Sequence, residues 1–144
     1  MYKNNLGRLQ ELTSTLERVE SNLVEEKSIL EFILESTTDG YWDWDIPKGY
    51  EYLSPKFKKQ LGYEPDEMED KPEAWQSICN TEDLTRSYEV MQSHFNGDTE
   101  EFREMLRFTH KEGYEIKILC RGKVIKRGVN GEPLRMIGTH TIIE

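Results

Sequence analysis

Apolar residues repeat every three to four positions through the first quarter of the chain. The repeat runs over residues 6–35, and seven of its eight core positions are apolar. No proline interrupts residues 1–46, so one helix can span the whole repeat, roughly 45 Å at 1.5 Å per residue. A stripe of that length needs a partner helix, most simply the same helix of a second copy. The predicted dimerisation residues are Leu9, Leu12, Leu16, Val19, Leu23, Leu30 and Ile33, with Glu26 as the polar exception.

The alternative for this segment is an amphipathic helix that folds back on its own domain. Ser36, Thr37, Thr38, Asp39 and Gly40 follow the repeat and end the helix. We therefore expect two parts, a coiled-coil dimerisation helix over residues 1–36 and a globular domain over residues 37–144.

From Gly40 the hydrophobic period changes to two. Trp42, Trp44 and Ile46 alternate with polar positions, and a Pro-Lys-Gly turn at 47–49 leads into a second run at residues 50–53. This pattern predicts a β-hairpin with one apolar face.

Short helical segments are predicted next. Ser54 can cap a helix that has Pro55 at its first position and ends at Gly62. A second start follows at residues 64–67, and residues 72–79 are helically spaced. Thr81 can cap a longer helix to about residue 96, whose apolar side would carry Leu84, Tyr88, Met91 and Phe95.

The last third of the chain returns to the strand period. Residues 102–108 and 114–124 alternate, Asn130-Gly131 is a strong hairpin signal, and residues 134–143 form a final strand. The order of one long helix, two strands, several short helices and three strands predicts an α+β fold. We expect an antiparallel sheet with its helices on one side.

Composition narrows the range of partners. The 144 residues carry a formal net charge of −9, which disfavours nucleic acid and anionic membranes, because both need a positive surface. No apolar run approaches the length of a membrane span, so no direct membrane contact is expected within this chain. Only two cysteines are present, which fits a reducing, cytoplasmic setting.

Five sequence segments, in this order and spacing, resemble the PAS sensor domain, in the variety with an early Trp-Asp pair and a terminal Gly-Thr-His-Thr strand. The segments are GYWDWD at 40–45, YLSPKFKKQLGYEPDEM at 52–68, AWQSICNTEDL at 74–84, FTHKEGYEIKILCRGKVI at 108–125 and NGEPLRMIGTHT at 130–141. The resemblance implies a five-stranded antiparallel sheet of order 2-1-5-4-3 with helices that enclose a small cavity. It also implies a regulatory module that works with an output domain such as a histidine kinase or a diguanylate cyclase.

Candidate chemistry is sparse. Asp43 and Asp45 share one strand face, but no third ligand or base accompanies them, which favours a solvated surface. Some PAS domains ligate haem through a histidine on the long helix; for His94 the position near the helix end favours a capping or surface role. Cys79 stands near the flavin-reactive cysteine of light-sensing relatives, but the sequence around it differs. We therefore predict no enzyme, no metal site, and neither haem nor flavin as cofactor.

A concave apolar surface is the main binding candidate. Aromatic side chains and methionines at such spacings form plain core more often than a ligand pocket, so a filled core is the alternative. The predicted pocket residues are Trp42, Trp44, Phe57, Leu61, Met91, Phe95, Phe102, Leu106, Phe108, Ile116, Cys120 and Met136.

The sequence thus predicts a sensory and dimerisation module. The expected partners are a second copy, through the N-terminal helix, an unidentified small apolar ligand, and an output domain in the full-length protein. The remaining alternatives are a haem- or flavin-binding sensor and a ligand-free protein-interaction scaffold.

Overall fold

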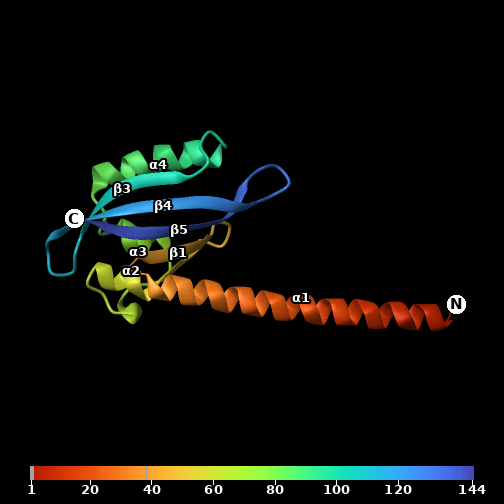
Figure 1. Ribbon diagram of the computed structural model, residues 1–144. Coiled ribbons are helices and arrows are strands. Elements are labelled where there is room, and N and C mark those ends of the chain that lie inside the picture. Colours follow the sequence, from red (N-terminus) through yellow and green to blue (C-terminus); the bar gives the residue numbers. More distant parts are fainter. Residues whose placement is uncertain (1, 38) are drawn as a thin grey trace. The chain divides into compact units, whose positions relative to one another are not determined.

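The computed structural model describes residues 2–37 and 39–144 (Figure 1). The chain divides into two compact units, Met1–Thr37 and Thr38–Glu144. This boundary lies next to the one that the end of the heptad repeat suggests.

The first unit is one helix, α1 (Tyr2–Ser36), of 35 residues. Its length agrees with the uninterrupted heptad repeat. All seven apolar core positions, from Leu9 to Ile33, are between 46% and 62% exposed. The single chain therefore leaves the predicted stripe in solvent.

The second unit is built on a five-stranded antiparallel sheet. Its strands are β1 (Gly40–Asp45), β2 (Tyr50–Leu53), β3 (Phe102–Thr109), β4 (Glu115–Arg127) and β5 (Pro133–Ile143). They lie in the order β2-β1-β5-β4-β3, which confirms the predicted topology. The N-terminal strand β1 reaches the centre of the sheet by pairing with the C-terminal strand β5, where Trp42 faces Gly138.

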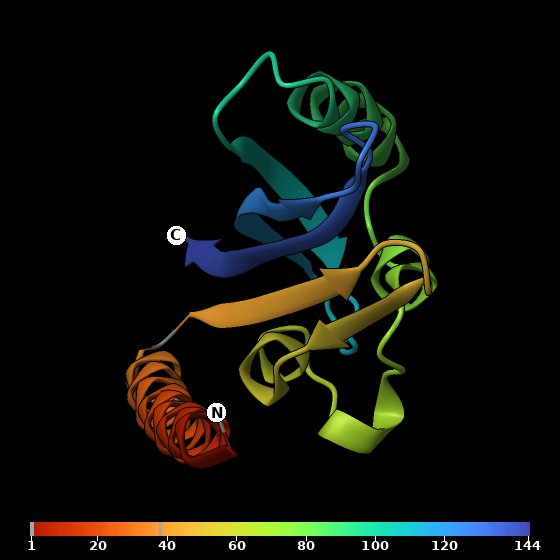
Figure 2. The same ribbon diagram turned by 90° about the vertical axis from the view of Figure 1, so that its right-hand side faces the viewer.

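The helices of this unit cover one face of the sheet (Figure 2). They are α2 (Pro55–Gln60), α3 (Pro72–Gln76) and α4 (Thr81–Phe95), and the predicted second start is a 3-10 turn, η1 (Pro65–Glu67). The Oγ atom of Ser54 accepts hydrogen bonds from the Phe57 N–H at 3.3 Å and the Tyr41 N–H at 2.8 Å. The predicted cap is confirmed, and it also ties α2 to β1.

The long helix α4 differs from its prediction in two ways. Its N-cap is Asn80, which accepts the Asp83 N–H at 3.0 Å, and not Thr81. Its buried residues are Asp83, Ser87 and His94, whereas Tyr88 is 54% exposed. The most buried side of α4 therefore carries these three polar residues, whereas Met91 and Phe95 of the predicted stripe are partly buried and pack against the core.

An ion pair with the half-buried Arg107 accompanies the buried carboxylate of Asp83 on α4. The carboxylate of Asp83 accepts hydrogen bonds from the Arg107 guanidinium at 2.9 Å and from the Arg107 N–H at 2.8 Å. The bonds from Arg107 lower the pKa of Asp83 to about 2. Because a buried carboxylate needs such partners, these bonds hold the Asp83 side of α4 against β3.

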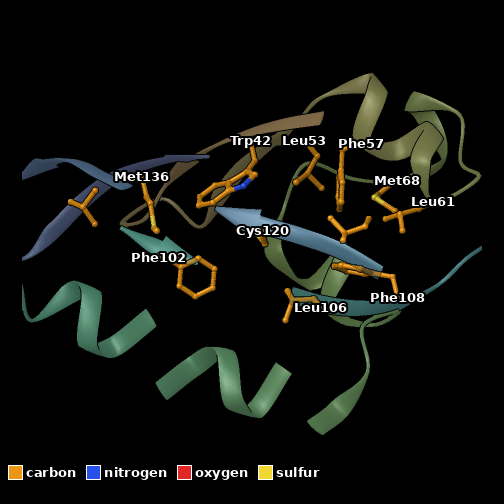
Figure 3. Close-up of a cluster of buried hydrophobic side chains, with 12 residues drawn as sticks. Trp42, Leu53, Phe57, Leu61, Met68, Phe102, Leu106, Phe108, Cys120 and Met136 are labelled. Atoms are coloured by element: carbon orange, nitrogen blue, oxygen red, sulfur yellow. The ribbon is translucent and has the colours of Figure 1, made fainter. Parts of the chain in front are cut away.

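The core lies between the sheet and the helices, and its side chains form one layer (Figure 3). Phe57, Leu61 and Met68 lie at one end of this layer and Met136 at the other. Its buried members are Trp42, Leu53, Phe57, Leu61, Met68, Phe102, Leu106, Phe108, Ile118, Cys120, Val124 and Met136.

Two glycines on neighbouring strands make room for Trp42 at the centre of the layer. Gly122 of β4 pairs with Gly138 of β5, and the indole ring lies against both. A Cβ atom on Gly122 would lie 2.5 Å from the Trp42 ring, and one on Gly138 would clash with the ring and with the Arg121 carbonyl oxygen. The Gly-Thr-His-Thr strand therefore needs its glycine for the close approach of an aromatic ring.

Gly122→Ala should destabilise the second unit by about 1–3 kcal/mol, because the added methyl group displaces a closely packed ring. Urea unfolding followed by tryptophan fluorescence measures this. The matched control is Gly7→Ala on α1, which adds the same group where nothing lies within 4 Å. Equal unfolding midpoints for the two variants would contradict the role given to Trp42.

Candidate functional site

A cavity of about 70 Å³ lies between the sheet and helices α3 and α4. That volume holds on the order of five water molecules, and it is well below the ~300–1,000 Å³ of most ligand pockets. All five strands and both helices contribute to its wall. The lining residues are Trp42, Trp44, Glu51, Pro72, Trp75, Gln76, Ser87, Tyr88, Met91, Phe102, Leu106, Phe108, Cys120 and His140.

The structure brings seven of the twelve predicted pocket residues together here, and it places the other five elsewhere. The seven are Trp42, Trp44, Met91, Phe102, Leu106, Phe108 and Cys120. Phe57, Leu61 and Met136 lie fully buried in the core. Phe95 packs on Trp44 with ring centroids 6.1 Å apart, and Ile116 packs against the edge of the core.

Six of the fourteen described lining residues carry a tryptophan, tyrosine or phenylalanine ring. Trp42 and Trp44 come from β1, Trp75 from α3, Tyr88 from α4, and Phe102 and Phe108 from β3. The Trp75 and Phe108 rings meet edge to face, with their centroids 6.2 Å apart. The period-two pattern of β1 places both of its tryptophans on the cavity side.

Glu51 is the polar residue that the sequence analysis missed. It lies on β2 directly opposite Trp44 and is only 5% exposed. Its Oε1 atom accepts a hydrogen bond from Trp75 Nε1 at 2.6 Å. Its position in an alternating Tyr-Glu-Tyr run gave no sign of burial, and only the β1–β2 register and the fold of α3 reveal it.

Burial raises the pKa of Glu51 to about 7. Desolvation of the carboxylate is the largest cause; the bond from Trp75 opposes it, and the negative charge of Glu73 adds to it. No ion pair joins Glu51 to a cation within the described ranges, 2–37 and 39–144. The cavity thus holds a carboxyl group that changes its charge near neutral pH.

His140 and Cys120 form another part of the wall. His140 is 4% exposed and stacks on Phe57 with ring centroids 3.8 Å apart. Burial lowers the pKa of His140 to about 3, so the ring is neutral at physiological pH. Burial also raises the pKa of the Cys120 thiol, with a further contribution from the charge of Glu51. Both groups are therefore uncharged, and the Cys120 thiol lies within electrostatic reach of Glu51.

The structure corrects the surface or capping role predicted for His94. This residue is only 3% exposed; its Nε2 atom accepts the Val124 N–H at 3.0 Å, and its Nδ1 atom lies 3.0 Å from the Thr99 carbonyl oxygen. The ring joins α4 to β4 through Nε2, and its Nδ1 atom lies against the loop that follows α4. Its role in the fold is structural, and neither nitrogen is directed to the cavity.

The remaining candidates are also accounted for by local contacts. Arg135 forms a bidentate pair with Asp43 at 2.9 and 2.5 Å, and Asp45 accepts the Lys48 N–H at 3.2 Å. Cys79 is half-buried, and burial raises its pKa to about 11, which disfavours a reactive thiolate. In the part of the chain that the structure describes, no three acidic, histidine or cysteine side chains gather as a metal site.

Of the helices in the described residues, none combines the length and the apolar content that crossing a bilayer requires.

The comparison with known families decides the classification. The model of the PAS fold matches residues 50–140, well over half of the chain. The chain belongs to the PAS fold family. The early Trp-Asp pair and the long helix lie before the matched range, and the cavity-lining residues from Glu51 to His140 lie within it.

Solved structures agree with this classification. A sensory box histidine kinase/response regulator from Burkholderia thailandensis E264 shares 27% identity, with a TM-score of 0.67 over 79% of this chain and 83% of that chain. The N-terminal domain of a diguanylate cyclase with PAS/PAC sensor from Marinobacter aquaeolei shares 20% identity, with a TM-score of 0.59 over 72% and 94%. A PAS domain from Colwellia psychrerythraea shares 15% identity, with a TM-score of 0.61 over 84% and 97%. A search of the curated proteins finds no match.

The PAS domain is therefore similar to the sensor domains of histidine kinases and diguanylate cyclases. The family model and the sheet order confirm the resemblance drawn from the five sequence segments.

Ionisation of Glu51 should make this PAS domain less stable as pH rises. The folded state holds the proton with a pKa of about 7, against 4.5 for an unperturbed glutamate, so the free energy of unfolding falls between about pH 4.5 and 7 and then levels off. The full effect is about 3 kcal/mol. Glu51→Gln should remove this slope while keeping an oxygen acceptor for Trp75. Urea unfolding at pH 5 and pH 8 measures the change in the free energy of unfolding for both proteins.

The matched control for this prediction is Glu89→Gln on the exposed side of α4, which should leave the pH dependence unchanged. If Glu51→Gln kept the slope of the parent protein, another group would be responsible for it.

Proposed function

We propose that this chain is the sensory module of a signal-transduction protein, and that a small molecule in the cavity changes the packing between the sheet and the helices. The observation that supports it best is the composition of the wall, to which five strands and two helices contribute. An occupant therefore contacts both layers at once. A ligand that binds two arrangements of these layers unequally shifts their populations.

In this proposal the second unit passes its change to α1, which joins two copies as a parallel coiled coil. The support is the exposed heptad stripe, because seven large apolar side chains in water favour a partner helix. A change in the register or splay of two paired helices then carries the signal.

The similar proteins support a proposal for the output domain. A histidine kinase/response regulator and a diguanylate cyclase both carry domains of this kind. We propose an output domain of one of these two classes in the full-length protein. Free Cys79 and Cys120 support a cytoplasmic location.

The alternatives differ in how the cavity is used. A cavity of about 70 Å³ is too small for a porphyrin or an isoalloxazine ring, and both nitrogens of His94 already have partners. A ligand-free interaction scaffold is the second candidate, favoured by the small cavity and the well-filled core.

Single cysteines on α1 test the dimer and its direction. In a parallel, in-register pair, Leu9→Cys and Leu30→Cys should each form a disulfide with the same position of the second copy. Ser14→Cys, half a helical turn from the stripe, is the matched control and should stay uncrosslinked. Crosslinking only in a mixture of the Leu9→Cys and Leu30→Cys proteins would indicate antiparallel pairing and overturn the proposal.

Native mass spectrometry of the unmodified chain completes this test. The expected result is a dimer, whereas a monomer at micromolar concentration would contradict the relay through α1. The Leu16→Asp/Leu23→Asp variant should be monomeric, because charge at two core positions disrupts the stripe. Its control, Ser14→Asp/Ser21→Asp, should remain dimeric.

A further inference from the structure

We propose that the cavity binds a small organic cation, an amine or a compact quaternary ammonium, with the Glu51 carboxylate as its counter-ion and the surrounding aromatic rings as its cage. This inference rests on the proposed function, because it names the ligand class of the same cavity. Three observations carry it: the charge of the lining, the nature of the wall and the size of the space.

The lining contains a carboxylate without a matching cation. Glu51 is only 5% exposed. The only hydrogen-bond partner described for its side chain is the neutral Trp75 N–H, at 2.6 Å. Lysine and arginine are absent from the described residues that line the cavity. A buried carboxylate is stable when it is paired with a cation, so a bound cation would supply the missing half of the pair.

The other titratable groups of the wall do not replace that cation. Tyr88 from α4, Cys120 from β4 and His140 from β5 face the cavity, and Glu73 on α3 acts on Glu51 from nearby. Burial leaves the Cys120 thiol and the His140 ring uncharged, and the charge of Glu73 adds to the raised pKa of Glu51, so no cation among the described lining residues opposes the carboxylate. The local potential is therefore negative, which attracts a cation and repels an anion.

The wall suits an organic cation better than a metal ion. Three tryptophans, two phenylalanines and a tyrosine line the space, and the faces of such rings attract ammonium groups. A hard metal ion needs several oxygen ligands, whereas Glu51 is the only carboxylate among the described lining residues. The volume of about 70 Å³ restricts the ligand to a few non-hydrogen atoms.

A neutral apolar molecule fits the rings but not the carboxylate. Such a ligand would leave Glu51 either ionised and unpaired or protonated. Binding of a cation requires the ionised form, so its affinity should rise from pH 6 to pH 8 and then level off, as Glu51 titrates with its pKa of about 7.

Calorimetric titration of the full chain compares trimethylammonium with tert-butanol, a neutral molecule that also carries three methyl groups on one central atom and is of similar size, with methylammonium and tetramethylammonium as smaller and larger probes. We expect trimethylammonium to bind at least about tenfold more tightly than tert-butanol at pH 8. Glu51→Gln should lower the affinity for trimethylammonium by about tenfold or more. The affinity for tert-butanol should stay unchanged, since the amide still accepts the Trp75 N–H. Thermal melting checks that the variant folds.

Trp44→Leu provides a second variant at a half-buried position, and it keeps the wall apolar while removing one ring face. This variant should lower the affinity for trimethylammonium more than the affinity for tert-butanol. Equal binding of both molecules, or binding of tert-butanol alone, would overturn the cation inference and leave a pocket sensor in place. If neither molecule nor the other two probes bound, the inference and ligand sensing in this cavity would both fail, while the crosslinking of α1 would still report on the dimer.

Discussion

The close approach of the Trp42 ring to the backbone of two strands is the contact on which the second unit depends. Gly122 and Gly138 pair across β4 and β5, and the indole ring occupies the space that their side chains would take. The ring is 3% exposed and packs at the centre of the core layer. Because protein interiors are close-packed, a large ring held against one sheet face determines what space remains between that face and the helices. The cavity is the part of that space that the neighbouring side chains leave open.

Polar groups then fix how the helices sit on this layer. Asp83 binds both the side chain and the backbone of Arg107, and His94 joins α4 to the backbone of Val124. Ser54 connects α2 to β1 in the same manner. Directional bonds of this kind specify one arrangement more narrowly than apolar contacts, which tolerate small shifts. Glu51 is different, because its carboxylate lines the cavity with a neutral donor and no cation among the described residues.

Much of the fold could be predicted from local patterns, and the site only in part. The alternation that places Trp42 and Trp44 on one face, the Ser54 cap and the Asn130-Gly131 turn act within a few residues, so the sequence reveals them directly. The selection of pocket residues among the apolar residues was less accurate. Phe57, Leu61 and Met136 were predicted to line the pocket but pack in the core, while Trp75 and Tyr88 line the cavity without having been predicted there. Periodicity identifies which residues are apolar, but it does not show which of them face an open space.

The sequence by itself determined the long helix with its heptad stripe and the succession of helices and strands along the chain, because hydrophobic period, glycine, proline and capping residues act locally. The order of the strands in the sheet came from the family resemblance of the five segments. Only the tertiary structure decided that Glu51 is buried, that His94 is a bridge between α4 and β4, and that α4 presents Asp83 to the sheet. The reason is that burial and charge depend on partners far along the chain: Trp75 lies 24 residues from Glu51, and Val124 lies 30 residues from His94. A polar residue looks like a surface residue in sequence until the fold provides its partner and excludes water.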